Sequence, residues 1–318
     1  MRPLPPARLR TLTTAAALGA LIAACEAPTA TSPGVDVAPA FSVGQGSGNV
    51  LDLANATLEA RGSEYRIAYA EYLTAAGSGR VGTVIFARDV GNKQLAFDFI
   101  PDDPRRGGAD GDPNTIDVWV DLTQGATSNG LGAGTTTAAI GRSVGTWDAA
   151  TCSEFSPNFI PVEVDLGLVQ SILGFGGTFT AVSDIMHAGW LPGAFFDLLA
   201  QDGSTFILGV TFTLTFTSGD LDGNGLPDLG AREIYYNDAF PWADDGVSHF
   251  DVETVALHEG GHGLSQAHFG TIFQTLRNGV IHFAPRAVMN AAYSGVQRSL
   301  SGTDDAGHCS LWASWPQK

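Results

Sequence analysis

The chain has 318 residues, of which 44% are hydrophobic and only 15% are charged. This composition is too apolar for a disordered chain, and it suffices for the buried core of one large domain or of two ordinary ones. The 16 Lys and Arg residues against 33 Asp and Glu residues give a formal net charge of -17. A surface with this charge repels phosphate backbones, so nucleic acid is excluded as a partner.

The N-terminus has the features of an export signal over residues 1–24. Arg2, Arg8 and Arg10 form a basic region, and an uncharged apolar stretch follows that is too short to span a bilayer comfortably. It ends in Leu-Ile-Ala-Ala-Cys, so Cys25 resembles the lipidated first residue of a bacterial lipoprotein, with ordinary cleavage near small residues as the alternative. We therefore expect an exported chain, either lipid-anchored in the cell envelope (outer membrane or cell surface) or secreted.

The next segments predict a tether and then a region rich in β-structure. Residues 25–48 contain mostly Ala, Pro, Thr, Ser and Gly, which is typical of a flexible tether. Within residues 49–107, strand-like segments at 65–69, 81–88 and 95–100 are separated by turn-rich segments. This pattern predicts a small β-rich region, to which the sequence assigns no chemistry.

Residues 108–318 predict an α+β domain with one mixed sheet, because strand patterns and helix patterns alternate along them. Strands are expected at 115–122, 160–166, 179–187, 206–216 and 232–236. Helices are expected at 135–151 and 252–264, and a last helix is expected to begin near Asp304 with Thr303 as its N-cap.

Two cysteines follow Cys25 in the sequence, Cys152 and Cys309. In an oxidising compartment we expect a disulfide between them, which would join the end of the first long helix to the last helix. Two buried free thiols are the alternative.

The most specific motif is H-E-G-G-H-G-L-S-Q-A-H, which begins at His258. His258 and His262 are four residues apart, so on a helix they project from one face and can share one ion. Glu259 can reach a water on that ion and act as its general base. Three neutral imidazoles suit a single catalytic Zn²⁺ with one open position. His268 is the candidate for the third ligand, because no glutamate follows Glu259 in the sequence.

The remaining histidines lack the spacing of metal ligands. They are His187, His249, His282 and His308. We expect them to be surface or hydrogen-bonded side chains.

The motif, together with Met289 downstream, resembles the metzincin pattern H-E-x-x-H-x-x-G-x-x-H followed by a Met-turn. The similarity is closest to the matrixins, the matrix-metalloproteinase type, and it covers residues 113–315. Residues 287–293 resemble the Met-turn and the segment that walls the S1′ pocket, with Tyr293 in that wall. Asp304 falls on the second Asp of the family's last helix.

The resemblance implies a metzincin-like catalytic domain that hydrolyses peptide bonds with a zinc-activated water. It also implies that Met289 forms an apolar floor beneath the histidines without binding the metal. Residues 206–210 resemble the edge strand along which an extended peptide binds, with Leu208 and Gly209 nearest the zinc. A plain buried strand is the alternative for this segment.

Three departures from the family pattern leave the ligands and the base intact. Ser265 stands where the family has Gly, at the turn that precedes the third histidine, which predicts a strained backbone and a looser site. Ala291 replaces the usual Pro after the Met-turn, which predicts a less rigid S1′ wall. The chain has no P-R-C-G-x-P-D element, so latency through a cysteine on the zinc is not expected.

A weaker motif predicts a structural Ca²⁺ site. Oxygen-bearing side chains occupy positions 1, 3, 5 and 9 of a calcium-loop pattern, namely Asp220, Asp222, Asn224 and Asp228. Position 12 is Ala231 instead of the usual bidentate Glu, so Glu233 or another carboxylate would have to complete the site. An Asp-rich turn without an ion is the alternative.

These features together predict a monomeric zinc endopeptidase that acts on a protein or peptide and meets the membrane only through a lipid anchor. Two alternatives remain open. One is a non-catalytic zinc- or calcium-binding surface module, and the other is a calcium-dependent adhesin built on the N-terminal half. Residues 49–107 are left as either a pro-region or a binding region.

Overall fold

The computed structural model describes residues 47–75, 78, 97–106, 111–179, 183–274 and 280–317. The expected export signal, lipidation at Cys25, the tether up to residue 46 and the strand at 81–88 lie outside these residues. Among the helices of the described ranges, none is both long and apolar enough to cross a membrane.

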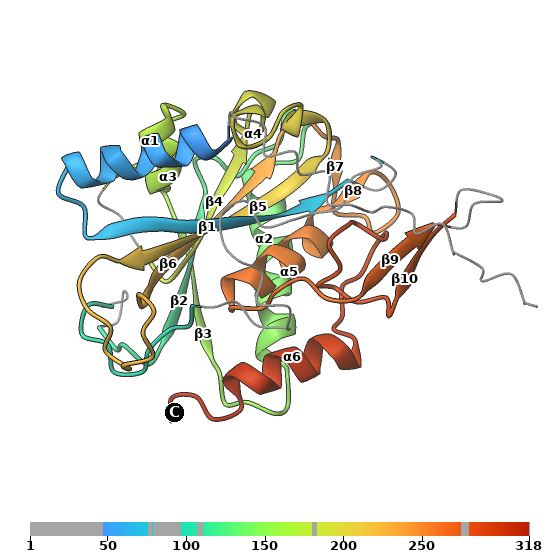
Figure 1. Cartoon of the computed structure of the whole chain (residues 1–318). Helices are drawn as coiled ribbons and strands as arrows, with labels where there is room; N and C mark the ends of the chain where they lie inside the picture. The colour runs from blue at the N-terminus through green and yellow to red at the C-terminus, as the bar shows by residue number, and fades with distance from the viewer. Residues whose placement is uncertain are drawn as a thin grey trace, which may run out of the picture. The chain divides into compact units, whose positions relative to one another are not determined.

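A six-stranded mixed sheet forms the centre of the described structure, in the order β1-β5-β6-β4-β2-β3 (Figure 1). Its strands are β1 (Tyr65–Thr74), β2 (Ile116–Asp121), β3 (Pro157–Val162), β4 (Ile185–Leu191), β5 (Ile207–Phe216) and β6 (Leu229–Asn237). Strands β3, β2, β4 and β6 are parallel to one another, whereas β5 is antiparallel to β6 and to β1. The fold is therefore mixed α/β, which is compatible with the predicted α+β class.

Helices cover both faces of this sheet. They are α1 (Ser47–Ala60), α2 (Ala133–Asp148), α3 (Leu168–Leu173), α4 (Gly193–Leu199), α5 (Val252–Gly263) and α6 (Gly302–Trp312). Helices α1, α3 and α4 lie on one face and α2, α5 and α6 on the other (Figure 1). Short elements complete the described chain: a 3₁₀ turn at Gly203–Thr205 and two small sheets formed by β7 (Trp242–Ala243) with β8 (Phe250–Asp251) and β9 (Thr271–Gln274) with β10 (Ile281–Ala284).

The two faces of the sheet carry two separate cores. Phe195 and Phe212 belong to the core beneath α1, α3 and α4, while Trp147 and Trp312 belong to the core beneath α2, α5 and α6. All ten residues of β5 are buried. Because both faces of β5 are covered, the threonines that alternate with apolar residues in its second half are buried as well.

The expected disulfide is present between Cys152 and Cys309, with an S–S distance of 2.02 Å. Cys152 follows the end of α2, and Cys309 lies in α6. The predicted link between the first long helix of the domain and its last helix is therefore confirmed.

The expectation of a separate β-rich region at 49–107 is wrong for its described part. Residues 47–60 form helix α1, and β1 is a strand of the main sheet. Residues 97–100, expected to be a strand, have no regular secondary structure. The helix buries Leu51, Ala54 and Leu58, whose i, i+3, i+7 spacing is typical of one helix face, so the sequence contained a signal that the prediction of a β-rich region overlooked.

The expected boundaries of three further elements need correction. Strands β3 and β4 begin and end at different residues from those expected at 160–166 and 179–187. Helix α6 begins at Gly302 with Ser301 as its N-cap instead of Thr303. The reason is a capping box: the Ser301 hydroxyl accepts from the Asp304 amide, and the Asp304 carboxylate accepts from the Ser301 amide at 2.9 Å.

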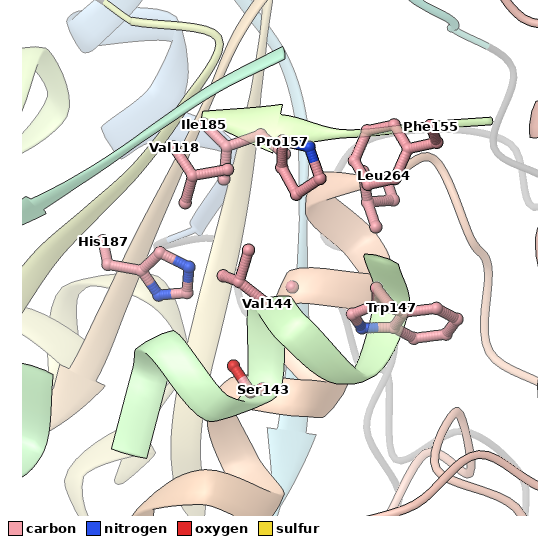
Figure 2. A pocket seen from close by; sticks show the side chains of 10 residues that line it. Val118, Ser143, Val144, Trp147, Phe155, Pro157, Ile185, His187 and Leu264 are labelled. Atoms are coloured by element: carbon pink, nitrogen blue, oxygen red, sulfur yellow. The ribbon is translucent and has the colours of Figure 1, made fainter. Parts of the chain in front are cut away.

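His187 is a buried, hydrogen-bonded histidine of β4. Of the two expected environments, exposed at the surface or hydrogen-bonded, it has the second. Its Nδ1 lies 2.7 Å from the Tyr236 hydroxyl, and its ring faces a small cavity between the sheet, α2 and α5 (Figure 2). The other walls of this cavity are mainly apolar, including Val118, Val144 and Ile185. Burial lowers the pKa of His187 to about 3, so the ring is neutral in the folded chain near pH 7.

Acid is expected to destabilise the chain partly through His187. Its folded pKa of about 3 lies below the ordinary value of 6.5, so the unfolded chain binds the extra proton between these limits. The contribution of His187 to the free energy of unfolding is complete above pH 6.5. It is lost as pH falls, by about 1.4 kcal/mol per pH unit. Urea unfolding with chelator at pH 6.5 to 4.5 should show a shallower pH dependence for His187→Phe than for wild type. Equal slopes for the two proteins would contradict this role.

Candidate metal centre

Helix α5 carries two of the predicted ligands, and its N-terminus is fixed by Asp251. The Asp251 side chain caps the helix by accepting from the amide and the hydroxyl of Thr254, at 2.9 and 2.6 Å. Asp251 is also paired with Arg298. The cap sets where the helix begins, and it thereby places His258 and His262 one turn apart on the same buried face.

The chain reverses direction immediately after α5, at Ser265. This residue has φ 64, a left-handed conformation that costs a residue with a side chain roughly 1–2 kcal/mol. The predicted strain is therefore present. The Ser265 hydroxyl donates to the Phe97 carbonyl at 3.1 Å and accepts from Arg232 at 3.2 Å. These bonds hold the turn in place, and the turn returns His268 to the other two histidines.

The three predicted ligands converge through their Nε2 atoms. The distance from His262 Nε2 is 3.1 Å to His258 Nε2 and 3.1 Å to His268 Nε2, and the third side of the triangle is 3.3 Å. Tetrahedral bonds of 2.0–2.1 Å from one ion would place such nitrogens about 3.3 Å apart. The group could therefore hold a metal ion.

The opposite ring nitrogens of the two helical histidines have fixed partners. His258 Nδ1 lies 2.7 Å from the Val288 carbonyl, and His262 Nδ1 lies 2.8 Å from the Gln266 carbonyl. Glu71 Oε2 also lies 2.8 Å from His262 Nδ1. Such partners fix the tautomer that leaves Nε2 free to bind a metal. Burial lowers the pKa of both rings, which keeps them in the neutral form that binds metals.

Met289 packs against α5 at Gly261. A Cβ atom at Gly261 would collide with the Met289 sulfur, so glycine is required for this close packing. The amides of Val288 and Met289 donate to the Asp304 carboxylate at 3.0 and 3.1 Å. Helix α6 therefore holds the segment whose carbonyl orients His258.

Glu259 follows His258 on α5 and is completely buried. Its Oε2 accepts from the Thr211 hydroxyl at 2.6 Å, and the Leu73 amide also donates to the carboxylate. Its Oε1 has no hydrogen-bond partner among the described residues. Burial raises the pKa of Glu259 to about 8, and the nearby Glu71 charge acts in the same direction. One carboxylate oxygen therefore lacks a protein partner in the described chain and is buried against Gly209.

The expectation that residues 206–210 lie at a sheet edge is wrong. Strand β5 is an interior strand, because β1 pairs with it from Tyr65 opposite Phe216 to Thr74 opposite Ile207. The two predicted substrate residues on β5 are both buried. Gly209 packs against the base, since a Cβ atom there would lie 2.9 Å from Glu259 Oε1.

Tyr293, the other predicted substrate residue, contacts β1 and the start of α5. Its amide donates to the Thr74 carbonyl at 2.9 Å, and its hydroxyl accepts from the Asp251 amide at 3.3 Å. Burial raises the pKa of Tyr293, so its hydroxyl stays protonated and remains a neutral polar group.

The predicted calcium loop brings three carboxylates together. Oxygens of Asp220, Asp222 and Asp228 lie within 4.8 Å of one another. Asp220 accepts from the amides of Gly225, Gly223 and Asn224, and these bonds lower its pKa, that of Gly225 most. Calcium occupancy stays a prediction.

Two residues near this loop change the expected ligand set. Glu233 does not complete the loop, because its carboxylate accepts from the amides of Leu168 and Val169, at 2.6 and 2.9 Å, and from the Tyr235 hydroxyl. That carboxylate lies at the N-terminus of α3, where a negative charge is favourable. Arg105 pairs with the buried Asp228, so a side-chain cation already meets this acid.

Three residues of the site were missed by sequence analysis. Thr211 donates to the Glu259 carboxylate, Arg232 donates to the His262 carbonyl at 2.6 Å, and Glu71 lies against His262 Nδ1. Glu71 alone had a visible signal, because it is the one acidic residue in strand β1, whose residues between Arg66 and Thr74 are otherwise apolar or aromatic. Buried acids are rare unless they are paired, so its position indicates a specific partner.

Comparison of the chain with protein-family models and with curated protein sequences returned no match. The class that the fold and site define is a mixed α/β protein with a three-histidine group able to hold a metal ion. Any function for the chain is therefore inferred from the chemistry of this group and its neighbours.

Proposed function

We propose that this chain is a zinc-dependent endopeptidase of matrixin-like type that hydrolyses peptide bonds in proteins or peptides. One observation carries the proposal: three histidine Nε2 atoms lie 3.1–3.3 Å apart, and the residue after His258 is the buried Glu259, whose Oε1 has no protein partner in the described chain. A structural zinc site is closed by a fourth protein ligand, whereas a catalytic site keeps a position for water.

The donor set favours zinc over other common metals. Three neutral imidazoles suit zinc, copper, iron or nickel, and the absence of carboxylate from the triad argues against magnesium and calcium. The near-equal spacing of the three Nε2 atoms suits the tetrahedral geometry that zinc adopts. Zinc bound here would act as a Lewis acid and would lower the pKa of a bound water.

Glu259 is suited to accept a proton at this position and to release it again. A general base works best when its pKa lies near the working pH, and burial brings Glu259 to about 8. Positive charge at the histidine group would lower this value, since an opposite charge favours the ionised carboxylate. Thr211 holds Oε2 at 2.6 Å, which leaves Oε1 to receive the proton from water and deliver it to the leaving amine.

The matrixin-like assignment is supported by the order of the elements around the triad. A helix carries two ligands, a turn at Ser265 precedes the third, Met289 packs beneath, and α6 closes the chain. The disulfide between Cys152 and Cys309 supports the proposed export, because disulfides persist in oxidising compartments. Lipid anchoring through Cys25 is proposed with it.

A second candidate is a zinc-binding surface module without turnover. One observation favours it: the strand expected to receive substrate is already paired with β1 along its length. The two candidates share the metal and differ in whether a peptide can reach Glu259.

Metal analysis and proteolysis assays test the proposal together. The dialysed chain should contain one zinc, and its hydrolysis of casein should disappear with a chelator and return when zinc is restored. A chain that binds no zinc would refute the proposal. A chain that binds zinc but cleaves nothing, even when substitutions weaken the pairing of β1 with β5, would favour the surface module.

A further inference from the structure

Strand β1 occupies the edge of β5 that β6 leaves open (Figure 1). Glu71 pairs with Thr211, and Leu73 pairs with Gly209, the residue that packs against Glu259. An extended peptide recognises a sheet by hydrogen bonding to a free strand edge. Only one strand can use that edge of β5 at a time.

The end of β1 is also held from its other side, by the segment that follows Met289. The Thr74 hydroxyl donates to the Ala291 carbonyl at 3.2 Å, and the Thr74 carbonyl accepts from the Tyr293 amide at 2.9 Å. Thr74 thereby forms a parallel bridge with Ala292. On the β5 side, the Ala75 amide donates to the Phe206 carbonyl at 2.7 Å. The strand therefore fills the space between β5 and residues 291–293.

Two further contacts join β1 to Glu259 and to His262. The Leu73 amide donates to the Glu259 carboxylate, and Glu71 Oε2 lies 2.8 Å from His262 Nδ1. Leu73 and Glu71 are both almost fully buried. The strand thus contacts the base through its backbone and a ligand through a side chain, in addition to covering the sheet edge.

We propose that β1 is an autoinhibitory strand, which binds where an extended substrate would bind and must move before a peptide reaches Glu259. This inference rests on the proposed endopeptidase function and concerns the regulation of the same site. The whole chain is then latent in its resting state, and its own residues 65–75 act as the competing peptide. The latency comes from strand pairing and backbone hydrogen bonds, and no cysteine takes part in it.

The test loosens only the end of β1 that faces the metal centre. The double substitution Leu73→Pro with Ala75→Pro removes the amides that donate to Glu259 and to Phe206. In the zinc-loaded full chain we expect cleavage of a quenched peptide substrate to rise at least tenfold. The matched control is Arg66→Pro, at the other end of the same strand and exposed to solvent, which should change cleavage less than twofold.

The outcomes separate this inference from the proposed function. If the wild-type chain binds zinc and cleaves peptides as fast as the loosened variant, β1 is not inhibitory and the endopeptidase stands. If the loosened variant gains activity and loses it again with Glu259→Gln, both are supported. Circular dichroism and zinc content show whether the double variant folds, and the single Ala75→Pro variant is the milder substitute.

A binding measurement decides the inference even if no variant cleaves peptides. A fluorescent peptide with the sequence of residues 65–75 should bind the loosened, zinc-loaded chain and not the wild type, and a scrambled peptide should bind neither. In an active variant the same peptide should inhibit cleavage. Equal binding to wild type and variant, or binding to neither, would overturn the assignment of β1 as a competing strand.

Discussion

Glu259→Gln is expected to reduce peptide hydrolysis by about 10²–10⁴-fold while the chain still binds one zinc. Glutamine has nearly the same size and keeps an oxygen that can accept from the Thr211 hydroxyl, now 2.6 Å from Glu259 Oε2. It cannot take a proton from water, so the general-base contribution is lost. The loss should appear in kcat, because Glu259 is not expected to contribute to substrate affinity.

The comparison is best made in the chain that carries Leu73→Pro with Ala75→Pro. This chain is expected to cleave peptides fastest, so a loss of activity is easiest to measure in it. The matched control is Glu163→Gln, which removes the same charge from an exposed position and should leave the rate unchanged. Zinc content measured on each sample separates loss of the base from loss of the metal. A Glu259→Gln chain that cleaves as fast as its parent would remove Glu259 from the reaction.

His268→Ala is expected to weaken zinc binding by about a hundredfold or more. Structural zinc sites with four ligands gain about 10–16 kcal/mol, so one ligand contributes roughly 3 kcal/mol. His268 is the proposed ligand whose position depends on the turn at Ser265, and it is less buried than the other two. Competition with a chromogenic chelator measures the affinity directly.

The control for this substitution is His282→Ala, which removes an imidazole from β10 and should leave the zinc affinity within a factor of two. A ligand that binds the folded state better than the unfolded state stabilises it, so the His268→Ala protein should also gain less thermal stability from added zinc. An unchanged zinc affinity would show that the third ring is not a ligand, and the proposed site would then have to be revised.

Local spacing determined much of the candidate site before any fold was considered. His258 and His262 meet because a helix places residues four apart on one face. Glu259 was recognised as the candidate base because it directly follows the first candidate ligand. The helix itself was visible from Val252 to Leu264, and the structure ends it one residue earlier. The left-handed turn at Ser265 was expected from the need to bring His268 back.

Contacts between distant segments were beyond the reach of the sequence. Glu71 lies 191 positions before His262, yet the two side chains meet, and Leu73 meets Glu259 from a similar separation. Thr211 reaches the base from β5 because the sheet passes beneath α5. A threonine in a buried strand is common in any sheet, so nothing in its neighbours marked it.

The sequence by itself identified the candidate ligands, the candidate base and the disulfide pair, because short spacings and a count of cysteines restrict these strongly. Only the tertiary structure decided that β1 pairs with β5 and changes that strand from an edge to an interior strand. The physical reason is that a strand carries the same backbone donors and acceptors whatever its sequence. Its partner is chosen by packing on both faces of the whole sheet, which local pattern does not encode.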